Sequence, residues 1–416
     1  MTTPWGGKRH DPRPDAEKAA AFDPLALHED YLDDPYPAYR ILRENDPVHR
    51  CPDGSYFLTR YADLVQVYKG AEFSSDKTRE YCPKYGADSL LYRHHTTSLV
   101  FNDPPLHTRV RALLSPAFTP RALQQLEPDL AALVERLLDE AQEKDSFDLI
   151  ADYASAIPVE VVGNMLGVPH ADRGPLRDWS LAILGALEPV TPPDVLARGN
   201  NAVSEFSSYL ADLIEERRKN PAQYEDDVMG RLITGSLDGD TLSDEELIQN
   251  CIFILNAGHE TTTNLIGNGV AALLEHPDAF ADLRADPTII DSAVEEFLRF
   301  ESSNQLGNRR VDTPTTVGGV EMASGTNIHL CIGAANRDPD EFDNPEHLHL
   351  KRQPNRHLAF GTGVHACAGM SLARIEGRLA IGQLVERFPN LERSGPFIRG
   401  GRVRFRGFLS YPVKAG

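Results

Sequence analysis

The residues best suited to chemistry lie in the segment Phe360–Gly369, which reads Phe-Gly-Thr-Gly-Val-His-Ala-Cys-Ala-Gly. Two glycines before the cysteine and one after it predict a tight loop with a close backbone approach. A helical pattern begins at about Ala368, so Cys367 is expected at a helix N-terminus. There the helix dipole and the free N–H groups favour a thiolate over a thiol. Such a thiolate can be a nucleophile, a redox group or a metal ligand.

Each of these functions of Cys367 requires different neighbouring residues. A nucleophile needs a histidine base across the site, but His365 belongs to the same turn. A zinc site needs three or four nitrogen or sulfur ligands, and only these two residues are local. A phosphate loop needs Gly-Lys-Ser/Thr, which is absent. A single axial thiolate on a haem iron needs no further local ligand. Another functional thiol and a structural glycine loop are the alternatives.

A second unusual segment, Asp244 to His276, predicts one long helix. Ser243 with Glu246 three residues later forms a capping-box start, and Pro277 follows the end. The middle of this helix changes abruptly from apolar residues to Ala-Gly-His-Glu-Thr-Thr-Thr. Threonine and glycine are poor helix formers, so the centre of this otherwise apolar helix has low helix propensity and an unexpected polar patch. Such a patch is a candidate for function, and a kink with satisfied threonines is the alternative.

Charge and composition exclude several classes of protein. The chain has 416 residues, with 42 Lys and Arg against 62 Asp and Glu, so its formal net charge is −20. This charge argues against nucleic acid as a ligand, which needs a basic surface. The sequence has no run of about 18 apolar residues that would predict a membrane span, and its N-terminus has no signal-peptide pattern. A cytoplasmic location is therefore expected. Five scattered cysteines without CxxC exclude a disulfide framework.

The pattern along the chain is mainly helical, with short strands and no long linker or repeat. We expect residues 1–20 to form a flexible arm and residues 21–416 to form a single domain. Apolar spacing predicts seven principal helices and three short strands. The helices are expected at 36–43, 121–144, 158–166, 202–219, 244–276, 288–300 and 371–387, and the strands at 54–59, 315–321 and 327–332.

These segments together resemble the cytochrome P450 family. Phe360–Gly369 matches the family's FGxGxHxCxG motif, and Glu296-Phe-Leu-Arg299 resembles its ExxR pair. Ala257–Thr262 is similar to its A-G-x-[DE]-T-T motif, and Asp103–Arg111 resembles its DPPxHxxxR segment. The motifs stand in the family's order and cover the chain from about residue 34 to 413. The resemblance implies a mainly α fold with small β-sheets, the cytochrome P450 fold, whose long central helix lies over the haem.

The resemblance also implies roles for individual residues. The cofactor is expected to be haem b (iron protoporphyrin IX), with the Cys367 thiolate as the metal ligand. Phe360 and Gly361 lie in the same cofactor-binding loop. Partners for the haem propionates are expected to be His107, Arg111, Arg309 and His365, with Arg310 as the rival of Arg309. Glu260 and Thr261 resemble the acid–alcohol pair that delivers protons to bound dioxygen, and the small residues Ala257 and Gly258 leave room for dioxygen. Glu296, Arg299 and Arg352 resemble a structural ion-pair network.

The substrate pocket is expected to bind a small or medium organic molecule that carries an oxygen function. The family builds this pocket from three segments, which here offer His95, Thr97, Ser98, Val100, Phe253, Asn256, Gln305 and Leu306. The alternative is that these polar side chains only satisfy the backbone or water. Residues 181–206, with prolines between two helical pieces, resemble a mobile lid over the substrate.

The implied activity is that of a monooxygenase, which places one atom of dioxygen in the substrate by hydroxylation or oxidative dealkylation. Electrons are expected from a separate ferredoxin with an NAD(P)H-dependent ferredoxin reductase, and the protein is expected to be a monomer. Five basic residues and one acidic residue in 351–378 form a basic island that would suit an acidic ferredoxin. A peroxide-driven peroxygenase and a non-enzymatic haem sensor or carrier are the alternative functions.

Overall fold

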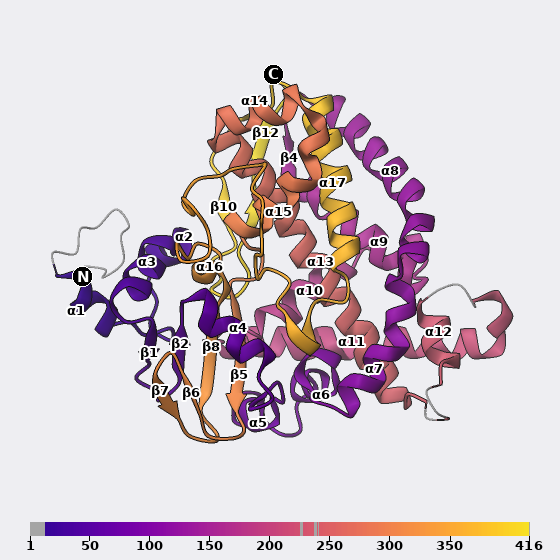
Figure 1. Cartoon of the computed structure of the whole chain (residues 1–416). Coiled ribbons are helices and arrows are strands. Elements are labelled where there is room, and N and C mark those ends of the chain that lie inside the picture. Colours follow the sequence, from indigo (N-terminus) through magenta and orange to yellow (C-terminus); the bar gives the residue numbers. More distant parts are fainter. Residues whose placement is uncertain (1–12, 225–227, 237–238, 240, 416) are drawn as a thin grey trace.

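The protein is predominantly helical, as the sequence predicts. The structure is a computed structural model that describes residues 13–224, 228–236, 239 and 241–415. Figure 1 shows β1, β2, β5, β6, β7 and β8 next to the N-terminal helices at lower left, and β4 and β12 at the top near the C-terminus. The longer helices lie on the other side of the molecule. The α-helices within the described residues are α1 Asp15–Ala20, α2 Glu29–Asp33, α3 Tyr36–Asn45, α4 Tyr61–Lys69, α5 Thr78–Tyr85, α6 Leu90–Thr97, α7 Leu106–Leu114, α8 Pro120–Gln142, α9 Ala156–Leu166, α10 Leu176–Gly185, α11 Pro193–Lys219, α12 Val228–Thr234, α13 Asp244–Glu275, α14 Pro277–Ala285, α15 Ile290–Phe300, α16 Ile332–Ala335 and α17 Met370–Arg387.

The strands are short and form four small sheets. The largest sheet has the order β1-β2-β8-β5-β3, in which only β2 and β8 run parallel. A second sheet has the order β4-β12-β9, and β6-β7 and β10-β11 are two-stranded. The strands are β1 Val48–Arg50, β2 Tyr56–Leu58, β3 Phe73–Ser74, β4 Phe147–Asp148, β5 Leu306–Val311, β6 Thr315–Val317, β7 Val320–Met322, β8 Asn327–Cys331, β9 Glu392–Arg393, β10 Ile398–Arg399, β11 Phe408–Ser410 and β12 Pro412–Lys414.

Two predicted elements differ from the structure for local reasons. The strand expected at 315–321 is a hairpin of β6 and β7, because Gly318 and Gly319 both adopt positive φ and turn the chain. Part of the expected flexible arm is the helix α1, and Ala19 in it is fully buried against the N-terminal core. Residues 1–12 of that arm lie outside the described residues.

The long central helix α13 forms as expected and organises the core. The Ser243 side chain accepts a hydrogen bond from Glu246 N, and the Glu246 carboxylate accepts one from Ser243 N, at 2.8 Å. The helix packs against α9, α10, α11, α15 and α17, and most of its side chains are buried. In Figure 1 it runs through the middle of the helical part, beside α17. Side chains from these five helices therefore surround α13.

One window, Leu149–Leu166, has the length and mean hydropathy of a membrane span, which the sequence reading did not find. It joins a π-helical turn, η3 (Leu149–Ala154), to α9 and includes Asp152 and Glu160. Two thirds of the window is buried inside the protein, where α9 packs on α13. Its apolar character is accounted for by the core.

Candidate active site

The Cys367 loop is built by glycines at left-handed positions, as the sequence predicts. Gly361 and Gly363 have φ of +62° and +75°, and a Cβ on Gly363 would lie 2.5 Å from the carbonyl oxygen of Tyr68. Only glycine tolerates that approach. The Cys367 backbone N–H donates to the carbonyl oxygen of Phe360 at 2.9 Å, which closes the loop on itself. The Phe360 ring packs against Arg374, whose guanidinium carbon lies 5.0 Å from the centre of that ring.

The Cys367 thiol lies further from a helix than expected. Helix α17 begins at Met370, with Gly369 as its N-cap, so the cysteine precedes the helix by three residues. Burial raises the pKa of the Cys367 thiol, although a hydrogen bond from the Gly369 backbone, Arg111 and Arg374 act in the opposite direction. The protein alone therefore does not favour the thiolate, whereas a coordinated metal ion deprotonates such a thiol outright.

The middle of α13 has one solvent-accessible face. Phe253, Gly258 and Thr261 are partly exposed and Ala257 is exposed, while the residues around them are buried. Residues 253, 257 and 261 are four apart and therefore share one face. The Thr261 Oγ1 donates to the Ala257 carbonyl oxygen at 2.7 Å. An accessible face in the middle of a buried helix marks a space that a ligand can fill.

The basic side chains predicted to bind the propionates lie close together. The His107 and His365 rings lie 4.1 Å apart, centre to centre. Burial, Arg309, His107 and Arg111 lower the pKa of His365 to about 3. Within the described residues, neither Arg111 nor Arg309 forms an ion pair. The nearby Asp103 carboxylate instead accepts from Ser74 Oγ at 2.5 Å and from Ser75 N at 2.8 Å.

This cluster fits a bound dianion. Arg111 and Arg309 are partly buried guanidinium groups without an ion-pair partner among the described residues, and two carboxylates such as haem propionates would supply one. The structure also separates Arg309 from its rival. Arg309 lies over the Tyr68 ring and interacts with His107 and His365. Arg310 instead pairs with Asp312 at 3.2 Å. The residues present therefore fit a haem whose propionates face His107, Arg111, Arg309 and His365.

We expect Arg309→Gln to lower haem affinity about ten- to hundredfold, because a charge-assisted hydrogen bond contributes roughly 1.5–3 kcal/mol. The measurement is the rate of haem transfer to an excess of apomyoglobin. Arg310→Gln is the matched control, one residue along the same strand, and its transfer rate should match that of the wild type. Equal rates for all three proteins would contradict this assignment.

The predicted structural network is assembled around a fully buried carboxylate. Arg299 donates two hydrogen bonds to Glu296, both at 2.8 Å, and Arg352 Nε donates at 3.0 Å. Two partners were not anticipated: the His349 backbone N–H and the Asn355 side-chain amide, at 2.9 and 3.1 Å. Every oxygen of Glu296 thus has more than one donor.

Glu260 forms an ion pair that the sequence alone did not predict. Arg402, in the loop between β10 and β11, donates to both carboxylate oxygens at 2.6 and 2.7 Å. The signal was an arginine-rich run at residues 399–406 in an otherwise acidic chain. No hydrogen bond joins Glu260 to Thr261 in the part of the chain that the structure describes. The expected acid–alcohol pair is therefore adjacent in sequence but not directly connected.

Four of the expected pocket residues lie on α6 and the turn after it, which pack against α13, and two lie on α13 itself. His95 and Asn256 are buried, and both nitrogens of His95 and Oδ1 of Asn256 lack a partner among the described residues. Thr97 and Val100 are partly exposed. Ser98 donates to the His94 carbonyl oxygen, so its hydroxyl is satisfied by the backbone, as the alternative interpretation holds.

Two of the expected pocket residues lie elsewhere. Gln305 donates to the Ser302 carbonyl oxygen at 2.7 Å, and its amide oxygen fills the place where a side chain on Gly333 would be. Leu306 is buried in the N-terminal core with Tyr39 and Cys331. Both belong to the packing of α3 and α16 against β5, because the residues after Ser303 enter the sheet directly.

The basic island at 351–378 is largely neutralised. Each of its cations has a carboxylate partner on another segment: Lys351–Asp286 at 3.3 Å, Arg352–Glu296 at 3.0 Å, Arg356–Glu341 at 3.9 Å, Arg374–Glu295 at 2.7 Å and Arg378–Glu127 at 2.5 Å. Its one acidic residue, Glu376, is buried. The surface is therefore less positive than the sequence indicates, and Arg356, 70% exposed, has the longest pairing distance.

Glu376 is a buried acid with no cation beside it in the described residues. Thr262 Oγ1 donates to it from α13 at 3.3 Å, and burial raises its pKa to about 8. The folded protein therefore keeps this proton between about pH 4.5 and 8, while the unfolded chain releases it. Stability from this group is complete below pH 4.5 and is lost as the pH rises, by about 1.4 kcal/mol per pH unit.

We accordingly expect Glu376→Gln to remove this fall in stability with rising pH. The free energy of unfolding of the variant, relative to the wild type, should increase by about 1.4 kcal/mol per unit between pH 5 and 8. Denaturant titrations at several pH values measure it. Glu386→Gln, at an exposed position of the same helix, is the control and should follow the wild type. Parallel curves for Glu376→Gln and the wild type would rule out a neutral Glu376.

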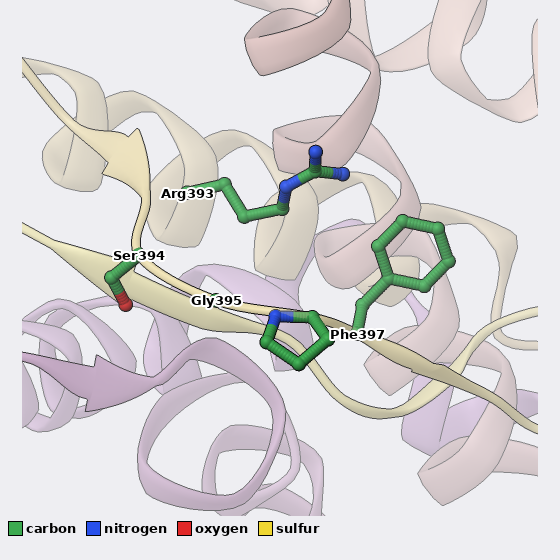
Figure 2. Close-up of a pocket in the computed structure, with 5 residues that line it drawn as sticks. Arg393, Ser394, Gly395 and Phe397 are labelled. Carbon is green, nitrogen blue, oxygen red and sulfur yellow. The ribbon is translucent and has the colours of Figure 1, made fainter.

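A separate surface hollow has a volume of about 530 Å³ and is lined by residues 393–397. Figure 2 shows the Arg393 and Phe397 side chains beside it. Their separation is 5.4 Å, from the guanidinium carbon to the ring centre. It contains none of the residues discussed above, so it is not part of this site.

Comparison with known proteins supports the same assignment. A model of the family described as Cytochrome P450 matches residues 184–394. Vitamin D(3) 25-hydroxylase of Pseudonocardia autotrophica is 40% identical over 366 residues, which are 87% of this chain and 88% of that protein. The biotin biosynthesis cytochrome P450 of Bacillus subtilis (strain 168) is 36% identical over 366 residues, 87% of this chain and 91% of that protein.

A solved structure with a similar fold is P450BioI in complex with an acyl carrier protein ligated to hexadec-9Z-enoic acid. Its TM-score is 0.87 at 34% identity, and the match covers 93% of this chain and 100% of that one. Proteins of this family bind haem b through a cysteine thiolate and use dioxygen to oxidise small molecules. The chain is thus an oxidoreductase of the haem monooxygenase class, and it belongs to the cytochrome P450 family.

Proposed function

We propose that this monooxygenase takes its electrons from a separate ferredoxin and oxidises a small or medium organic substrate that carries an oxygen function. The observation that carries the proposal is the joint presence of the Cys367 loop, the accessible face of α13 and the cluster of basic side chains without ion-pair partners. Haem b would supply the oxidising chemistry there. Cys367 would hold its iron, and His107, Arg111, Arg309 and His365 would hold its propionates.

The residues on α13 control space and protons. Ala257 is small and exposed, so it leaves room for dioxygen beside the helix. Gly258 does not add to this space, because a Cβ on it would lie 2.8 Å from the Val162 side chain of α9. The Thr261 hydroxyl, now bonded to the Ala257 carbonyl oxygen, can turn and hold a proton at Oγ1 towards that space. Glu260 is the acid that reloads this hydroxyl. Because Arg402 engages both of its carboxylate oxygens, Glu260 must leave that partner first.

Polar atoms support an oxygen-bearing substrate. The Asn256 amide oxygen and the His95 ring are buried and lack partners in the described part of the chain. A substrate hydroxyl could donate to Asn256 Oδ1, and a substrate hydroxyl or carbonyl could accept from the His95 ring N–H. The relatives are consistent with this class. One is named a vitamin D(3) 25-hydroxylase, and one solved neighbour holds an acyl carrier protein with a fatty acid. A panel of spin-state titrations tests it; preference for a hydrocarbon over the alcohol with the same carbon skeleton would contradict it.

A three-way turnover assay tests the electron source. Turnover with ferredoxin, ferredoxin reductase and NAD(P)H is expected to exceed turnover with hydrogen peroxide alone. Faster turnover with peroxide would identify a peroxygenase, and a haem protein inactive with both would identify a sensor or carrier. Arg356, the least tightly paired cation of the basic island, is the residue we propose for ferredoxin contact. The proposed location is the cytoplasm, where such carriers operate.

A further inference from the structure

Arg402 connects the acid of the site to the part of the chain expected to act as its lid. Its Nη1 atom donates to both oxygens of Glu260 on α13, and its Nη2 atom donates to the Leu181 carbonyl oxygen on α10 at 3.2 Å. The ion pair is nearly enclosed, with 9% of the Glu260 side chain and 16% of the Arg402 side chain exposed. A single guanidinium thus bridges two helices.

The residues after Arg402 strengthen this connection. Glu188, which follows α10, accepts from the backbone N–H groups of Val403 at 2.8 Å and Arg404 at 3.2 Å. The loop at 402–404 is therefore held to the α10 region at two points, and to α13 at one. Movement of α10 away from α13 must break the contact to Leu181 or pull Arg402 off Glu260.

The carboxylate of Glu260 lies against a small cavity. The cavity has a volume of about 20 Å³, enough for about one water molecule, and Glu260, Arg402, His259, Asn264 and Arg177 are among the residues that line it. His259 is 1% exposed, and neither of its ring nitrogens has a partner among the described residues. The Asn264 amide nitrogen also lacks one. Glu260 is thus bound on the cavity side, without a bond to Thr261.

We propose that Arg402 is a positioning residue that holds the Glu260 carboxylate away from Thr261 and couples its release to movement of α10. The inference rests on the proposed function, since it assumes that Glu260 supplies protons. A buried carboxylate without its cation takes up a proton. In the intact pair, burial raises the pKa of the Glu260 carboxyl and Arg402 opposes that rise, while the charge of Glu188 adds to it. His259 beside it is neutral, since burial and Arg177 lower its pKa to about 3.

The test compares Arg402→Gln with the wild type by infrared difference spectroscopy and by hydrogen exchange. We expect a new protonated-carboxyl band at neutral pH, which is absent in the double variant with Glu260→Gln. We also expect the amides of α10 to exchange severalfold faster. The pH profile of coupled turnover should shift upward by about one to three units. Arg402→Lys, which restores the charge, should reverse the band and the shift.

Other variants keep the proposal falsifiable. Glu188→Gln loosens the second attachment, so it should speed exchange in α10 without producing the carboxyl band. If Arg402→Gln does not fold, Glu260→Gln breaks the same pair from the other side and should also speed exchange in α10. Absence of the band, or unchanged exchange in α10, overturns the proposal. The carbon monoxide spectrum of the reduced wild type separates the two failures, because it tests the haem-thiolate site without involving Arg402.

Discussion

Replacement of Glu296 by alanine is expected to remove most of the folded protein. The carboxylate is fully buried and satisfies Arg299 and Arg352 as well as the Asn355 amide. Without it, two buried guanidinium groups keep their charge and lose their anion, which costs about 3–5 kcal/mol. That is a large share of the 5–15 kcal/mol that typically stabilises a folded protein. The yield of soluble haem-containing protein and the midpoint of denaturant unfolding measure the loss.

The neighbouring residue provides the matched control for this experiment. Glu295 pairs with Arg374 at 2.7 Å and with His357 at 3.2 Å, but its side chain is 26% exposed and Arg374 is 41% exposed. Glu295→Ala should therefore cost only about 1 kcal/mol, because solvent screens the pair. Similar losses for the two alanine variants would show that Glu296 has no special structural role.

Replacement of Cys367 by serine is expected to abolish monooxygenase turnover and the red-shifted Soret band of the reduced carbon monoxide complex. A thiolate donates electron density to the iron and favours cleavage of the O–O bond, and a hydroxyl does not replace it. The fold should persist, because the loop is held by the Phe360 carbonyl oxygen and by the glycines rather than by the sulfur atom. Absorption spectra and circular dichroism of the same samples measure both effects.

Cys82→Ser is the control, since Cys82 is a partly exposed free cysteine in α5 that belongs to none of the sites described. It should keep the wild-type spectrum and turnover. A thiolate-type band that survives in Cys367→Ser would assign the axial ligand to a different residue and overturn the proposed site.

The chemistry of the site could be predicted because its determinants are local in sequence. The glycine loop, Cys367 and the cap of α13 each occupy a few consecutive residues, and such patterns dictate backbone conformation directly. Spacing also placed Glu296 and Arg299 on one turn of a helix. Gly318 and Gly319 show the limit even of local reasoning, since their turn divides a stretch whose composition suits one strand.

What the sequence determined by itself is therefore the fold class, the haem-binding loop and the polar centre of α13. Only the tertiary structure decided how the charges are paired. It placed Arg402 on Glu260, although 142 residues separate them, and it gave each cation of the basic island a carboxylate from another segment. It also placed Gln305 against Gly333 rather than in the pocket. The physical reason is that a side chain's electrostatic partner depends on which surfaces the fold brings within a few ångströms, and no local pattern encodes that choice.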